Sequence, residues 1–193
     1  MSNALTGREC GSGRLCFAPE TRLRDPNSGP KLVRHQSPRR RQTLKARYAA
    51  MGARHSGREA ALQMLFQIEL SGTSADMAIE LFWRSFIDGV DPEGRAYADE
   101  AVRGVATTCG DLDRLIVDAS VHWRLERMAR VDRNILRLGA WELAHRQDVP
   151  RAVVLDEAVE LAKAFGTDDS SAFVNGVLNR IAETLGRTSD PKA

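Results

Sequence analysis

The stretch from Arg151 to Leu185 constrains the fold of this chain most strongly, because it carries two consecutive amphipathic helices. Apolar residues recur every three or four positions in both halves, the period of a helix with one buried face. They are Val154, Ala158, Leu161, Ala162 and Phe165, then Phe173, Val177, Leu178, Ile181 and Leu185. We expect Gly166 to end the first helix in a left-handed conformation, and Asp168, Asp169 and Ser170 to cap the second. These signals predict a helical hairpin.

The chain from residue 51 to the hairpin also follows a helical period. Ser56 with Glu59 three residues later is expected to form a capping box at the first helix. Asp111 is expected to cap a short helix, and Gly139, which costs roughly 1 kcal/mol relative to Ala inside a helix, predicts a close crossing by another helix. The expected helices cover residues 54–70, 74–87, 92–110, 111–119 and 129–146, followed by the hairpin. The sequence therefore predicts an all-α fold of about seven helices in two packed helical subdomains.

Charge is distributed unevenly along the chain. Residues 1–50 contain 11 Lys or Arg and three acidic residues, a net charge of +8, and because the whole chain carries +2 the remainder carries −6. The 193 residues, 42% of them hydrophobic, are enough to bury one substantial core. A body with a charge of −6 does not attract nucleic acid as a whole, so any RNA site must be a local basic cluster.

The first 50 residues differ from the rest in composition. They contain the turn and linker motifs GSG, DPNSGP and QSPRRRQ and no sustained apolar period, so we expect them to be disordered. Either Met51 is the true start of the protein, or this leader is a basic arm, centred on Arg39, Arg40 and Arg41, that attracts RNA. Residues 51–187 are expected to form the folded domain and residues 188–193 a disordered tail.

Patterns typical of catalytic, metal-binding and membrane-spanning sequences are missing. Three cysteines, Cys10, Cys16 and Cys109, lack the spacing of a zinc site and are expected to be free thiols in a reducing cytosol. No histidine stands at metal-ligand spacing, and neither a phosphate-binding glycine motif nor a nucleophile elbow occurs. We therefore expect a protein that is not an enzyme and needs no cofactor or metal. Without a secretory signal or an apolar span, we expect it to be cytoplasmic and to have no membrane partner.

Three segments together resemble one known family: GREAALQMLFQIEL, DRNILRLGAWEL and VVLDEAVELAKAFGTDDSSAFVNGVL. In this order they are similar to the first helix, to the helix that precedes the C-terminal signature, and to that signature itself in NusB, a family of bacterial transcription antitermination factors. The similarity extends from about Gly52 to Leu185 without large gaps. It implies a domain of two helical subdomains that binds RNA.

A basic cluster, Arg54, His55 and Arg58, stands at the start of the first expected helix. Positive charge is unfavourable at a helix N-terminus, which favours a binding role over that of a solvated helix end. Arginines clamp phosphates and stack on bases. The resemblance implies that the arginine-rich N-terminus belongs to the RNA surface, so these three residues are expected to bind RNA from an exposed first turn. The chain has fewer arginines here than NusB members with a run of three.

The second candidate group, Asp169, Phe173 and Asn175, lies at the start of the last helix. The resemblance implies that Asp169 and Phe173 lie at the RNA surface, where a ring stacks on an unpaired base and a carboxylate accepts from an exocyclic amine. The alternatives are that Asp169 only caps the helix and that Phe173 fills the core. Asn175 is either a polar anchor or a reader of bases.

One further residue, Asp132, is expected at a partner interface. An acidic residue in the first turn of a helix stabilises the helix by about 0.3 kcal/mol or slightly more, and this effect alone could explain an aspartate at this position. The resemblance implies instead that Asp132 contacts NusE, the ribosomal protein that holds boxA RNA together with NusB. A charged rim of this kind sets orientation and association rate.

The sequence thus predicts an antitermination factor that binds boxA-like single-stranded RNA with NusE. In that role it supports RNA polymerase in an antitermination complex on ribosomal RNA operons. Two other functions stay open: a NusB-like domain of the kind found in ribosomal RNA cytosine methyltransferases, and a helical scaffold that binds only proteins. A homodimer that hides the RNA face is also left open.

Overall fold

The computed structural model describes residues 52–85, 90–120 and 123–187. Within these ranges the chain forms six α-helices, one 3-10 turn and no strand. The elements are α2 (Ala53–Ser71), α3 (Ala75–Ser85), α4 (Pro92–Ala119), η1 (Leu125–Arg127), α5 (Arg130–His145), α6 (Arg151–Phe165) and α7 (Ser170–Thr184). The all-α prediction is confirmed, with six helices where about seven were expected. The predicted leader and C-terminal tail lie outside the described residues.

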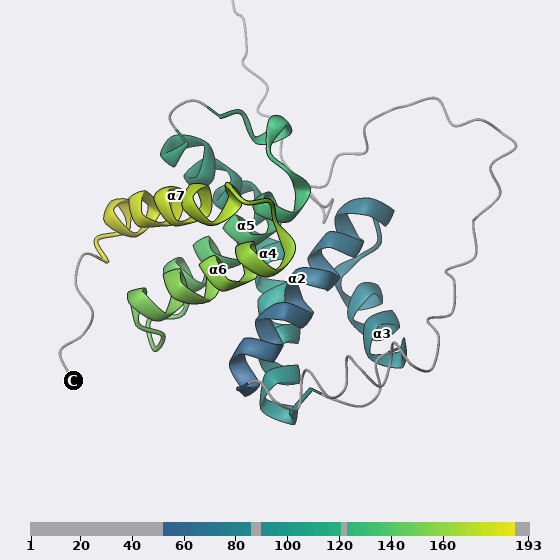
Figure 1. The fold of residues 1–193 in the computed structure, drawn as a ribbon. Helices are drawn as coiled ribbons and strands as arrows, with labels where there is room; N and C mark the ends of the chain where they lie inside the picture. The colour runs from purple at the N-terminus through teal and green to yellow at the C-terminus, as the bar shows by residue number, and fades with distance from the viewer. Residues whose placement is uncertain (1–51, 86–89, 121–122, 188–193) are drawn as a thin grey trace, which may run out of the picture.

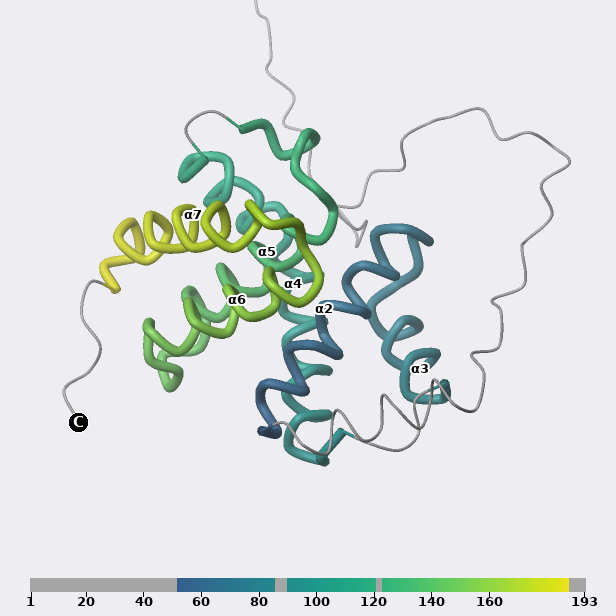
Figure 2. The backbone as a smooth tube through the Cα atoms, viewed as in Figure 1, coloured from purple at the N-terminus to yellow at the C-terminus, as the bar shows by residue number. Residues whose placement is uncertain are grey.

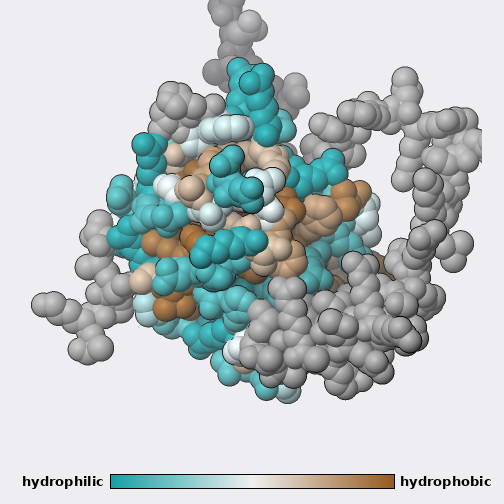
Figure 3. Space-filling view, viewed as in Figure 1, coloured by the Kyte–Doolittle hydropathy of each residue, from teal (hydrophilic) through white to brown (hydrophobic). Residues whose placement is uncertain are grey.

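The helices form two groups around a shared core. Figures 1 and 2 show α2 and α3 on one side, α6 and α7 on the other, and α4 and α5 between them. Buried apolar side chains from every helix join one cluster, for example Leu65, Phe82, Val105, Leu143, Val154 and Leu178. On the face shown in Figure 3, hydrophilic residues surround smaller hydrophobic patches. None of the described helices is long and apolar enough to cross a membrane.

The longest helix, α4, corrects the expected division between residues 110 and 111. It is continuous from Pro92 to Ala119, and Asp111, expected to cap a new helix, lies inside it and pairs with Arg114 at 3.2 Å. The apolar face of α4 continues across this point with Val105, Cys109, Leu112 and Ile116, all of them buried. A sustained buried face therefore outweighs the local signals of a glycine and a capping residue, and this one helix spans both groups.

Two glycines allow α2 and α4 to approach closely at their N-terminal ends. A Cβ atom added at Gly57 would lie 2.5 Å from the Gly94 carbonyl oxygen, and one at Gly94 would lie 2.3 Å from the Ala53 oxygen. The close crossing predicted at Gly139 is also confirmed, because a Cβ there would lie 2.8 Å from the Leu178 side chain of α7. Side chains larger than hydrogen would push these helices apart.

The predicted hairpin is present as α6 and α7, although its turn differs from the expected geometry. Gly166 has φ −92° and ψ −161°, an extended conformation and not a left-handed one. Glycine suits this position because an added Cβ would lie 2.6 Å from the Ser170 side chain. The Ser170 hydroxyl accepts a hydrogen bond from the Thr167 backbone N–H at 2.9 Å. The turn is therefore held by contact between its own residues.

The predicted capping box on α2 is wrong. The helix begins at Ala53 after Gly52, with no side-chain cap, so Ser56 and Glu59 lie inside it. The Ser56 hydroxyl donates to the Ala53 carbonyl at 2.8 Å, and Glu59 is 1% exposed. Since the helix starts earlier than the motif suggested, both side chains face the interior.

Candidate functional site

Two of the three residues of the basic cluster, Arg54 and His55, lie at the accessible start of α2. The side chain of Arg54 is 48% exposed; its Nε lies 3.4 Å from Glu93, and an Nη atom lies 3.9 Å from Asp148. Such long, solvated ion pairs contribute little stability, so a phosphate can replace them at small cost. The Nδ1 atom of His55 lies 2.6 Å from a carboxylate oxygen of Glu157, which joins this end of α2 to α6.

The third residue, Arg58, corrects the expectation of an exposed side chain. It is 2% exposed, and its Nε and Nη2 atoms donate to the Glu142 carboxylate of α5 at 2.8 to 3.1 Å. Its guanidinium carbon lies 5.2 Å from the centre of the Tyr97 ring, and Nη1 lies 3.6 Å from Glu157. The helical period explains the difference, because Arg58 is in line with Ala61 and Leu65 on the buried face of α2.

The partner of Arg58, Glu142, is a residue that the sequence reasoning missed. Burial raises the pKa of the Glu142 carboxyl, and the nearby charge of Arg58 acts in the opposite direction. A signal was available: Glu142 follows Ile135 and Leu138 at helical spacing, on the buried face of α5. A charged residue on such a face needs a partner of opposite charge, and Arg58 was the candidate on α2.

A second arginine, Arg146, extends this network to the surface. It donates to the Asp148 carboxylate at 2.8 and 2.9 Å and to Glu100 at 2.8 Å. The hydrogen bond from Arg146 lowers the pKa of Asp148 to about 2. The Arg146 guanidinium also lies 5.3 Å from the Tyr97 ring centre. Charged side chains therefore tie α4, α5 and the following loop together beneath the candidate residues of α2.

At the start of α7, Asp169 and Asn175 are exposed and Phe173 is half-buried. Asp169 occupies the capping position with φ −83°, but its side chain makes no capping hydrogen bond. Its expected role as a side-chain cap is therefore wrong. The Asn175 side-chain oxygen accepts from Asn179 at 3.1 Å, within the same helix. The polar groups of Asp169 and Asn175 both lie at the surface, where a ligand can reach them.

The ring of Phe173 lies beside that of Trp123, a residue of the connection between α4 and α5. The two ring centres are 5.9 Å apart with 57° between the ring planes. Trp123 is 55% exposed, so this indole is a surface group.

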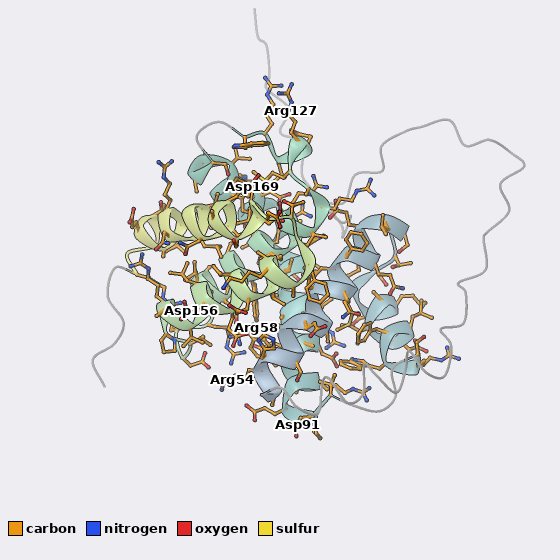
Figure 4. The ribbon with its side chains drawn as sticks, viewed as in Figure 1. Arg54, Arg58, Asp91, Arg127, Asp156 and Asp169 are labelled. Carbon is orange, nitrogen blue, oxygen red and sulfur yellow. The ribbon has the colours of Figure 1, made fainter. Side chains whose placement is uncertain are left out.

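The two candidate groups occupy different places on the molecule. Figure 4 shows Arg54 and Arg58 in its lower part and Asp169, at the start of α7, above them. Helix α6 contacts the first group through the Glu157–His55 pair. Its Arg151 donates to Asn179 of α7 at 2.5 Å, and Asn179 in turn donates to Asn175 of the second group. The structure thus relates the groups through α6 and does not bring them into one cluster.

The expected partner residue, Asp132, is 8% exposed and so is not on an open rim. Its Oδ1 atom has no hydrogen-bond partner among the described residues. Close by in the sequence, Arg133 and Asn134 both donate to Glu69 of α2, the latter at 2.7 Å. Glu69 was also missed by the sequence reasoning, and it fixes the start of α5 against the end of α2.

The described residues contain no group of three or more His, Cys, Asp or Glu side chains that could hold a metal ion. Cys109 is buried in α4, where its thiol donates to a carboxylate oxygen of Asp113 at 3.8 Å. The two candidate groups present charged, hydrogen-bonding and aromatic side chains.

Comparison with known proteins places these features in a family. The model of the NusB family matches residues 55–183. A transcription antitermination protein NusB from Sorangium cellulosum is 66% identical over 137 residues, which cover 71% of this chain and 96% of that protein. The corresponding protein of Myxococcus xanthus is 48% identical over 139 residues, covering 71% of this chain and 99% of that protein.

Solved structures agree with the sequence comparison. NusB of T. maritima has a TM-score of 0.63 and 33% identity, covering 72% of this chain and 94% of that one. A chain from a crystal structure of the antitermination factors NusB and NusE in complex with dsRNA has a TM-score of 0.63 and 25% identity, covering 72% of this chain and 98% of that one. The chain therefore belongs to the NusB family of transcription antitermination proteins.

Proposed function

We propose that this protein binds boxA-like single-stranded RNA together with NusE. In this role it is a non-catalytic adaptor that supports RNA polymerase during transcription of ribosomal RNA operons. The observation that carries the proposal is the 66% identity to a transcription antitermination protein NusB, extending over 96% of that protein. The related NusB structure that contains both NusE and RNA supports the choice of partners.

The proposal gives the candidate residues different roles. Arg54 supplies an exposed cation for a phosphate, and His55 lies beside it. Asp169, Phe173 and Asn175 present a carboxylate, a ring and an amide at the start of α7. These five residues are the proposed RNA contacts. Arg58 acts through its buried ion pair, which holds α2 in place, and does not itself reach solvent.

Asp132 is the proposed contact for NusE. The proposal rests on membership of the NusB family. Asp132 is 8% exposed and its Oδ1 atom is buried, so a partner would reach it only through the part of the residue that remains exposed. Asp132→Asn should keep the fold and weaken binding of NusE, while RNA binding by the isolated protein stays unchanged. Asp111→Asn, which changes an exposed side chain of α4, is the matched control. If both variants bind NusE as the unmutated protein does, Asp132 is not a contact.

A mobility shift with labelled boxA RNA, with and without NusE, tests the proposal as a whole. We expect binding of the single strand that becomes stronger when NusE is added. A duplex of the same sequence is included because the related complex contains dsRNA. If the protein binds NusE but binds no RNA, the result would instead support the protein-binding scaffold. Stronger binding of the RNA substrate of such a methyltransferase than of boxA RNA would support the domain found in ribosomal RNA methyltransferases.

The oligomeric state belongs to the same test. A homodimer that covers the RNA surface would weaken RNA binding as the protein concentration rises. Sedimentation at the concentrations used for the mobility shift distinguishes that case from a monomer.

A further inference from the structure

The indole of Trp123 is exposed, in contrast to the other two tryptophans. Trp123 is 55% exposed, whereas Trp83 and Trp141 are 6% and 4% exposed. A large aromatic side chain left in water gives up the stabilisation that burial would supply, about 25 cal/mol for each Å² of apolar surface. Its position at the surface therefore calls for a role other than packing in the core.

The backbone that carries Trp123 is held in place. The backbone N–H of Trp123 donates to the Ser120 carbonyl at 3.3 Å, and the Arg133 guanidinium donates to the Leu125 carbonyl at 2.8 Å. Met128, at the other end of the segment, is 6% exposed and belongs to the core. The segment thus displays the indole from a fixed backbone, which lowers the entropic cost of binding a ligand there.

Trp123 extends the aromatic surface that begins with Phe173. The two rings, whose centres are 5.9 Å apart, come from the α4–α5 connection and from the first turn of α7. A single exposed ring offers one stacking position, whereas two neighbouring rings offer a broader apolar platform. Unpaired nucleobases stack on such platforms whatever their sequence, because every base has a π-face.

The charge around Trp123 suits a nucleic acid. Residues 123–130 contain three arginines and one acid, Glu126. Arg124 and Arg127 are exposed, and the Arg130 side chain is 49% exposed. Figure 4 shows Arg127 at the upper edge of the molecule, beyond Asp169. Because the folded body is acidic overall, this segment is a local basic cluster of the kind that an RNA site requires.

We propose that Trp123 is a base-stacking residue of the RNA site, forming a platform with Phe173 on which an unpaired base of single-stranded RNA lies. Arg124 and Arg127 bind the phosphates on either side of that base. This inference rests on the proposed RNA-binding function and adds a contact to it. It extends the site beyond α7 to the connection between α4 and α5.

Tryptophan fluorescence tests the platform without any mutation. Since Trp83 and Trp141 are buried, acrylamide in solution quenches mainly Trp123. Adding single-stranded boxA RNA to the full chain should lower the emission of Trp123 and protect it from acrylamide. If the RNA binds in a mobility shift and quenching by acrylamide is unchanged, the indole does not contact the RNA and the inference is overturned.

Variants measure how much the contact contributes. Trp123→Ala should weaken binding of boxA RNA about five- to 150-fold, the effect of losing one stacked base, and leave the salt dependence unchanged. Trp123→Phe should keep most of the affinity. Arg124→Ala and Arg127→Ala should each make the slope of log affinity against log salt shallower by about one. Arg114→Ala, an exposed arginine on α4, is the matched control and should leave the slope unchanged.

The outcomes separate this inference from the proposed function. Normal binding by Trp123→Ala, with weaker binding by Arg54→Ala, would overturn the platform and leave the RNA site in place. Loss of NusE binding alone in Trp123→Ala would overturn it in favour of a protein contact. If the unmutated protein binds neither single-stranded nor duplex RNA, the proposed function fails and the platform with it.

Discussion

Arg54 and Arg58 lie one turn apart on α2, yet their surroundings are opposite. Arg54 is 48% exposed and makes long contacts with solvated carboxylates, whereas Arg58 is 2% exposed and binds Glu142 through three short hydrogen bonds. The resemblance to NusB placed both on one RNA-binding surface. The difference teaches that the position of an arginine in the helical period, and not its charge, decides whether it is available to a ligand.

Removing the buried arginine should have the largest effect on stability. Arg58→Ala leaves the Glu142 carboxylate buried without its partner, which costs about 3–5 kcal/mol. Denaturation by urea, followed by circular dichroism, measures this change. The double variant Arg58→Met with Glu142→Leu should recover most of the loss, because it removes both charges and keeps the volume. If Arg58→Ala is as stable as the unmutated protein, the ion pair does not hold α2 in place.

The next effect concerns the close approach of α2 and α4 at Gly57, next to Arg58. Gly57→Ala would place a Cβ 2.5 Å from the Gly94 carbonyl oxygen, so the helices must separate, at a cost of about 1–3 kcal/mol. Gly176→Ala is the matched control, since a Cβ there meets nothing within 4 Å and the substitution should stabilise α7 by about 0.5–1 kcal/mol. Thermal melts of both variants measure the difference. Equal shifts in the two would contradict the close crossing.

At the exposed arginine the effect should move from stability to binding. Arg54→Ala should change the free energy of unfolding by less than about 0.5 kcal/mol, because its ion pairs are solvated. RNA binding should weaken, and the slope of log affinity against log salt should become shallower by about one. Fluorescence anisotropy at several salt concentrations measures the slope. An unchanged slope would mean that Arg54 does not contact a phosphate.

The smallest effect on stability is expected at Asp169. Its side chain makes no capping hydrogen bond. The free energy of unfolding of Asp169→Asn and of Asp169→Ala should therefore lie within about 0.5 kcal/mol of that of the unmutated protein. RNA affinity or selectivity should nevertheless change in both variants, as the proposed site requires. A melting temperature that falls only in Asp169→Ala would show that this side chain caps α7 in solution. Unchanged RNA binding in both would remove Asp169 from the proposed site.

The candidate site could be predicted in part. The sequence predicted an exposed Arg54 and, from the family resemblance, a surface position for Asp169, and both residues are exposed. For Asn175 the sequence left a polar anchor and a base reader open, and the residue is exposed. It could not show that Trp123 contacts Phe173, because the two residues are 50 positions apart and neither lies in a motif that includes the other. Contacts between distant segments depend on how the helices pack, and a local pattern does not encode them.

By itself, the sequence determined the all-α fold, the α6–α7 hairpin and the family, because helical periodicity and local similarity depend on neighbouring residues. Only the tertiary structure decided that α4 is one continuous helix and that Arg58 pairs with Glu142. Both outcomes depend on burial: a long apolar face outweighs a local glycine, and a charge on a buried face must find a partner on another helix. Packing between helices, rather than propensity within them, therefore decided which residues of this chain can meet a ligand.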